Sequence, residues 1–79
     1  MRTVTLYTRE GCHLCDDAAL VLERVRAEIP FALDTVDIEA DAALHRRYLE
    51  RIPVVALDGE ELFDYFVDEP ELRRRLRAK

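Results

Sequence analysis

The chain has 79 residues, enough for one domain, and we treat residues 1–79 as a single unit because it contains no linker, repeat or low-complexity tract. Seventeen acidic against twelve basic residues leave a net charge of −5, which argues against a nucleic-acid-binding protein. No run reaches the about 18 apolar residues of a membrane span, and no cleavable apolar segment precedes the first predicted strand. We therefore expect a cytoplasmic monomer with no membrane or nucleic-acid partner.

The first half of the chain predicts a strand, a helix and a second strand. Residues 3–8 alternate in polarity and are rich in β-branched side chains, which favours a strand that Gly11 ends. A stripe of apolar residues then recurs every three or four positions and predicts a helix as far as Ile29, because Pro30 follows. A strand from Phe31 to about Asp37 completes a right-handed parallel βαβ unit. The predicted stripe consists of Leu14, Ala18, Val21, Leu22, Val25 and Ile29.

The second half predicts a short helix, a hairpin and a final helix. Asp41 can cap a helix that runs to about Glu50, and residues 54–57 and 60–65 flank Asp58-Gly59, a strong two-residue hairpin signal. Asp68 and Glu71 have the spacing of a helix cap, with Leu72 and Leu76 anchoring the last helix. The order is βαβαββα, which predicts an α/β fold with a four-stranded mixed sheet and helices on both faces.

The two cysteines of the chain, Cys12 and Cys15, lie where the first strand gives way to the first helix. A spacing of three places both sulfurs on one helical face, close enough to form and release a disulfide. The helix amino terminus favours a thiolate at Cys12, although Asp16 and Asp17 oppose it by like charge. A disulfide closing so short a loop would stabilise the fold little, so we favour thiol–disulfide exchange over a structural cross-link.

The element order, the cysteine pair and a proline at the head of the third strand resemble the glutaredoxin branch of the thioredoxin-like fold. The resemblance covers essentially the whole chain and is carried by residues 6–15, 36–38, 52–55 and 58–59. It implies that Cys12 is the attacking thiolate and Cys15 the resolving thiol. It also implies a cis peptide bond between Ile52 and Pro53, with the Ile52 backbone offered to an extended substrate. The resemblance is to small bacterial glutaredoxin-like proteins whose C-x-x-C lacks the usual Pro-Tyr.

Two departures from the glutaredoxin pattern bear on the substrate. The Gly-Gly pair that approaches glutathione in that family is replaced by bulky residues at 62–65, and His13-Leu14 stand between the cysteines. Exchange chemistry survives both changes, whereas glutathione specificity does not follow automatically. We expect no bound cofactor, with glutathione as a co-substrate and a disulfide-containing protein or glutathione as the partner.

Several basic side chains of the chain can be interpreted in two ways. Arg9 matches a position where the family meets a glutathione carboxylate, or it is an exposed loop arginine. His13 assists the thiolate, or it is a solvent-facing spacer. His45 and the nearby Arg46, Arg47 and Arg51 are interpreted as surface charge, although the arginines could also help to hold an anionic substrate. Tyr7, Phe31 and Tyr48 are interpreted as core rather than site.

Two rival functions remain from the sequence. The cysteines could bind a metal or an iron–sulfur cluster, but a structural zinc site needs a second ligand pair that the chain lacks. The domain could also be a non-catalytic interaction module. Retention of both Cys12 and Cys15 argues against that second alternative.

Overall fold

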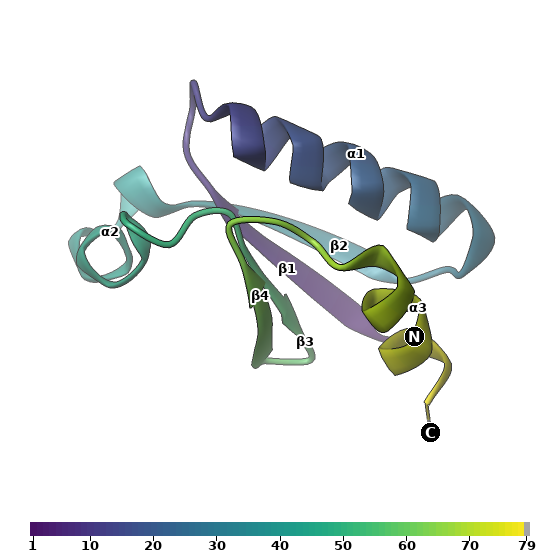
Figure 1. Ribbon diagram of the computed structural model, residues 1–79. Helices are drawn as coiled ribbons and strands as arrows, with labels where there is room; N and C mark the ends of the chain where they lie inside the picture. Colours follow the sequence, from purple (N-terminus) through teal and green to yellow (C-terminus); the bar gives the residue numbers. More distant parts are fainter. Residues whose placement is uncertain (79) are drawn as a thin grey trace.

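Alternating apolar strands and one long amphipathic helix build the architecture of the computed structural model, which describes residues 1–78 (Figure 1). The predicted α/β order is confirmed, with an additional short 3₁₀ helix after the second strand. None of the helices in residues 1–78 combines the length and apolar character needed to cross a membrane. The elements are β1 (Thr3–Thr8), α1 (His13–Glu28), β2 (Ala32–Asp37), η1 (Ile38–Ala40), α2 (Ala42–Tyr48), β3 (Val54–Leu57), β4 (Glu60–Asp64) and α3 (Glu69–Arg77).

The four strands form one mixed sheet in the order β2-β1-β3-β4. β1 is parallel to β2 and antiparallel to β3, and β4 returns antiparallel to β3. Tyr7 near the end of β1 pairs with Val54 at the start of β3, which in turn pairs with Asp64 at the end of β4. The loops before α1, before β3 and after β4 therefore meet at one edge of the sheet (Figure 1).

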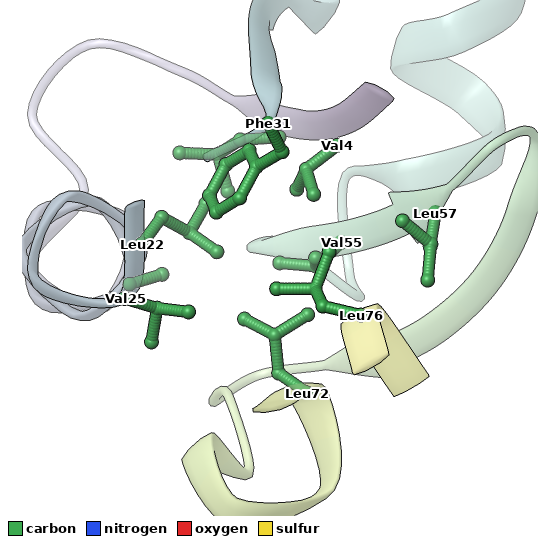
Figure 2. Close-up of a cluster of buried hydrophobic side chains, with 10 residues drawn as sticks. Val4, Leu22, Val25, Phe31, Val55, Leu57, Leu72 and Leu76 are labelled. Carbon is green, nitrogen blue, oxygen red and sulfur yellow. The ribbon is translucent and has the colours of Figure 1, made fainter. Parts of the chain in front are cut away.

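The main core lies between the sheet and helices α1 and α3. Figure 2 shows Leu22 and Val25 of α1 and Leu72 of α3 pointing toward Val55 of the sheet, and all four side chains are fully buried. Side chains alternate between the two faces of a strand, so Val4 and Leu6 of β1 contribute to this layer. The buried members of the cluster are Val4, Leu6, Ala18, Leu22, Val25, Phe31, Val55, Leu57, Leu72 and Leu76.

A second, smaller core lies on the α2 face, at the edge where the three loops meet. Cys15, Tyr48 and Ile52 are buried in it, with Tyr7 and Cys12 packed at its border. The paired cysteines are therefore part of a hydrophobic cluster that covers one end of the sheet.

The prediction that Leu14 belongs to the buried stripe is wrong, because its side chain is 48% exposed. Helical side chains lean toward the amino terminus, so a residue in the first turn of α1 leans toward the preceding loop instead of over the sheet. The rest of the stripe faces the main core, and α1 ends at Glu28 with Ile29 as its C-cap.

The predicted turns and caps are formed, with one change. Asp58 and Gly59 both have positive φ, at 50° and 90°, as a tight two-residue hairpin requires. The Asp41 and Asp68 side chains accept hydrogen bonds from backbone N–H groups in the first turns of α2 and α3. The Glu71 carboxylate does not complete the expected reciprocal cap, because it accepts from Arg74 and Arg75.

Candidate active site

Cys12 is the N-cap residue of α1 and therefore lies at the positive end of a 16-residue helix. Its Sγ atom accepts a hydrogen bond from the backbone N–H of Cys15, at 3.2 Å. The Cys12 side chain is half-buried, which leaves it open to a partner disulfide. Cys12 is therefore an accessible sulfur at the start of a helix, the kind of position in which nucleophilic cysteines are found.

Cys15 occupies the opposite environment, one turn further into the helix. It is only 2% exposed and, like Cys12, is a free thiol. Burial, and after it the hydrogen bond with Cys12, raise the pKa of the Cys15 thiol above its ordinary value, while Thr8 and the Arg9 backbone act in the lowering direction. The two sulfurs are therefore inequivalent, with one accessible and the other protected and held in the thiol form.

The segment before β3 closes the site from the other side. Ile52 and Pro53 are buried, and the peptide bond between them is cis. The Tyr65 N–H donates to the carbonyl oxygens of Pro53, at 2.9 Å, and Arg51, at 3.2 Å. Because Ile52 shares its hydrophobic cluster with Cys12 and Cys15, the fold brings this loop and the cysteine pair together.

Arg9 and His13 lie at the surface beside the cysteines. The Arg9 Nε atom forms an ion pair with Glu39 Oε1 of η1, at 3.2 Å, so its charge is already matched by a carboxylate. His13 is the first residue of α1 and is exposed. Both lie near Cys12 in the chain, and their roles toward a substrate remain predictions.

A polar network centred on Glu61 was missed by the sequence reasoning. The Tyr48 hydroxyl donates to Glu61 Oε2 at 2.8 Å, and Arg51 donates to Oε1 at 2.7 Å. Arg47 forms a third contact with the same carboxylate, and both arginines lie over the Tyr48 ring. Arg47 and Arg51 are therefore surface charges that pair with the same carboxylate, with side chains 65% and 38% exposed.

The Tyr48 ring also contacts the sheet, stacking on Tyr7 with 4.5 Å between ring centroids. The core prediction for Tyr48 and Phe31 is confirmed, since they are 4% and 2% exposed. Tyr7 is only half-buried. Tyr48 shares a cluster with Cys15, so it belongs to the core that supports the site.

We expect Tyr48→Phe to lower the free energy of unfolding by about 1 kcal/mol at neutral pH, because one hydrogen bond to Glu61 is lost. Burial, followed by the hydrogen bond to Glu61, raises the pKa of Tyr48 to about 12, whereas the unfolded phenol titrates near 10. Because the folded-state pKa is raised, the contribution of the protonated Tyr48 hydroxyl to the free energy of unfolding is complete below pH ~10. This contribution is lost as the pH rises through about 12. The difference between wild type and variant in urea unfolding should therefore shrink above pH ~10. A difference that stays constant from pH ~9 to ~12 would contradict this assignment.

A metal site would need donors that converge within one chain. In the part of the chain that the structure describes, no three His, Cys, Asp or Glu side chains are placed together to hold a metal ion. Cys12 and Cys15 alone supply two sulfur ligands. Any metal or cluster at this site would need further ligands from elsewhere.

The arrangement defines a class of protein, a thioredoxin-fold domain with two cysteines in C-x-x-C spacing at the start of its first helix. Residues 3–77 match the model of the glutaredoxin-like domain family, and the chain belongs to this family. An uncharacterized protein of Mycobacterium tuberculosis is 37% identical over 75 residues, covering 89% of this chain and 77% of that protein.

Solved structures agree with the family assignment. A protein from Nitrosomonas europaea, solved by NMR, has a TM-score of 0.82 and 32% identity, over 94% of this chain and 89% of that chain. An X-ray structure from X. campestris has a TM-score of 0.77 and 43% identity, over 96% and 97% of the two chains. A thioredoxin variant from Halobacterium salinarum, at 22% identity, 95% and 71% coverage and a TM-score of 0.68, is similar in fold alone. A glutaredoxin-like domain with paired cysteines indicates a redox function.

Proposed function

We propose that this domain is a thiol–disulfide oxidoreductase that reduces protein disulfides or glutathione mixed disulfides through Cys12 and Cys15. The observation that carries the proposal is the inequivalence of the two sulfurs. Cys12 is accessible, caps α1 and accepts the Cys15 N–H, whereas Cys15 is buried with its pKa raised. One thiol is suited to attack and the other to resolve.

The reaction transfers two electrons from the protein to the substrate. The Cys12 thiolate attacks one sulfur of the substrate disulfide, forming a mixed disulfide and releasing the first substrate thiolate, which takes up a proton. The Cys15 thiol loses its proton and its sulfur attacks Cys12, forming the Cys12–Cys15 disulfide and releasing the second substrate thiol. The protein is oxidised and an external thiol, for which we propose glutathione, returns it to the dithiol.

The proposed unit is a monomer without a bound cofactor. All the residues that build the site come from one chain, and the reaction needs no redox group beyond the two sulfurs. The buried Ile52-Pro53 segment lies beside the cysteines and would position an extended substrate strand. Arg9 and His13 are proposed to contact the substrate at the rim. We propose that the protein works in the cytoplasm, where thiols are kept reduced.

The test is equilibration in glutathione redox buffers, followed by acid quenching, alkylation and intact-mass spectrometry. We expect wild type to convert between the dithiol and the Cys12–Cys15 disulfide as the ratio of reduced to oxidised glutathione changes. Cys15→Ser should accumulate one glutathione on Cys12, because the resolving thiol is gone. Cys12→Ser should accumulate little, because the remaining thiol is buried.

Two thiols that stay inert at every glutathione ratio would overturn the proposal. Iron and zinc should be measured on the same freshly purified sample. Stoichiometric metal bound through the cysteines, together with inert thiols, would favour the metal-binding alternative instead.

A further inference from the structure

The segment between β4 and α3 forms an apolar pocket against the first turns of α1. The cavity measures about 120 Å³, and Leu14, Val21, Tyr65 and Phe66 contribute to its walls. Three of these side chains are unusually open for their size: Leu14 is 48% exposed, Tyr65 49% and Phe66 73%. Apolar side chains that stay exposed together around one hollow make this surface a candidate for binding an apolar group.

Tyr65 is held in place although its backbone conformation would suit glycine better. Its φ of 69° lies in the left-handed region, which costs a non-glycine residue about 1 kcal/mol. Its N–H donates to the Pro53 and Arg51 carbonyls, a role that any residue could fill. The side chain is what distinguishes tyrosine here, because its hydroxyl donates to the Glu50 carbonyl and its ring forms a pocket wall.

Two residues of the pocket wall link it to the two halves of the proposed site. Leu14 lies between Cys12 and Cys15 in the chain, and the Tyr65 N–H is hydrogen-bonded to the carbonyl oxygen of Pro53. A chain that placed a disulfide against Cys12 would bring its neighbouring side chain to this pocket. At roughly 30 Å³ per water molecule in the liquid, the cavity equals about four waters, room for one aliphatic side chain.

The charge around the pocket selects against acidic partners. Among the described residues, Asp17 is the one charged side chain in the pocket lining, and Asp16 of the first turn of α1 precedes it in the chain. An acidic substrate side chain bound in the pocket would be repelled by the Asp16 and Asp17 carboxylates. An apolar side chain with a neutral or basic neighbour would meet no such repulsion.

We infer that Leu14, Tyr65 and Phe66 form a specificity pocket for an apolar side chain adjacent to the reactive cysteine of an extended protein disulfide. The inference rests on the proposed function and narrows its substrate to protein segments of apolar, non-acidic sequence. Tyr65 is the specificity-determining residue, because it ties the pocket wall to the Ile52-Pro53 segment.

The experiment compares three synthetic peptides, each a symmetric disulfide dimer, with leucine, serine or glutamate beside the cysteine. Reduced protein in excess attacks one peptide sulfur and releases one peptide thiol, then forms its internal disulfide and releases the second, so no other reductant is needed. Acid-quenched single turnovers are followed by chromatography of the free peptide thiol. We expect the leucine peptide to react about tenfold faster than the serine peptide, and the glutamate peptide to be the slowest.

Two variants and one matched control test the pocket. Leu14→Ser and Tyr65→Gly should each reduce the leucine-to-serine rate ratio to about two or less. Leu20→Ser changes an exposed leucine on the same helix, outside the pocket, and should leave the ratio at its wild-type value. The ratio is unaffected by a general loss of active protein, and thermal unfolding checks that each variant is folded.

Each outcome separates the inference from the proposed function. Equal wild-type rates for the leucine and serine peptides would overturn the pocket and leave disulfide reduction standing. A leucine preference that persists in both pocket variants would also overturn it. Failure to reduce any of the three peptides would overturn the proposed function and the inference together.

Discussion

Cys12→Ser is expected to lower the rate of disulfide reduction by about 100-fold or more, to the background of the uncatalysed reaction. A serine hydroxyl is a far weaker nucleophile than a cysteine sulfur, and Cys12 is the accessible sulfur of the pair, at the N-cap of α1. The measurement is the initial rate of peptide-disulfide reduction with dithiothreitol as the recycling thiol.

Cys15→Ser is the matched comparison, because it removes the other sulfur of the same helical turn. In a single-turnover assay without dithiothreitol, which would itself cleave the mixed disulfide, we expect it to retain the first attack and to stop at the mixed disulfide, so one peptide thiol is released per protein molecule. The reverse pattern, with Cys12→Ser active and Cys15→Ser inactive in the first step, would show that the roles are exchanged.

Leu22→Ala is expected to destabilise the domain by about 2–5 kcal/mol, measured as the free energy of urea unfolding. Leu22 is fully buried in the main cluster between α1, the sheet and α3 (Figure 2), so its removal loses apolar contacts and leaves a cavity. Because small domains have unfolding free energies of only about 5–15 kcal/mol, this substitution alone should remove a large fraction of the stability of the domain.

The control is Leu20→Ala, which makes the same chemical change two residues earlier on the same helix. Leu20 is 67% exposed, so its replacement should alter the unfolding free energy by no more than about 0.5 kcal/mol. Similar destabilisation by both variants would show that burial of the leucine side chain is not the cause, and helix propensity could not explain it either. Alanine has the higher propensity, so a propensity effect would be slightly stabilising at both positions.

The two predictions concern the same helix, because α1 carries the proposed reactive cysteine at its N-cap and also buries Ala18, Leu22 and Val25 in the main core. The carboxyl end of the helix is anchored by Leu22 and Val25, while its amino end presents Cys12 and Leu14 to the surroundings. The anchored part holds the first turn in position, which is what a reactive group at a helix terminus requires.

Much of the architecture follows from local patterns in the sequence. Residues 3–8 and 54–57 form strands at their predicted positions, because alternating or continuous apolar runs have few other ways to bury their side chains. Asp58-Gly59 makes the predicted hairpin, since both positions adopt positive φ. The position of Cys12 at the start of a helix also follows from sequence, because Gly11 ends the strand pattern just before it and the helical spacing of apolar residues follows.

A bulge between β3 and β4 places Glu61 and Phe63 on opposite faces of the sheet. Glu61 and Phe63 would point to the same face of a regular strand, but a register shift between Val55 and Ala56 pairs Phe63 with Val55 and Glu61 with Ala56. Phe63 therefore packs on the main core, while Glu61 meets Tyr48. No periodicity in the sequence records a bulge of this kind.

Local patterns suffice to predict the strands, the long helix and the position of Cys12 and Cys15 at its amino terminus, because these depend on residues within a few positions of one another. Long-range packing places Leu14 outside the core, in a pocket wall with Tyr65, and it brings Tyr48, Arg47 and Arg51 onto Glu61. Those contacts join residues ten or more positions apart, so they arise from the pairing of strands and the packing of helices, which local preference does not encode.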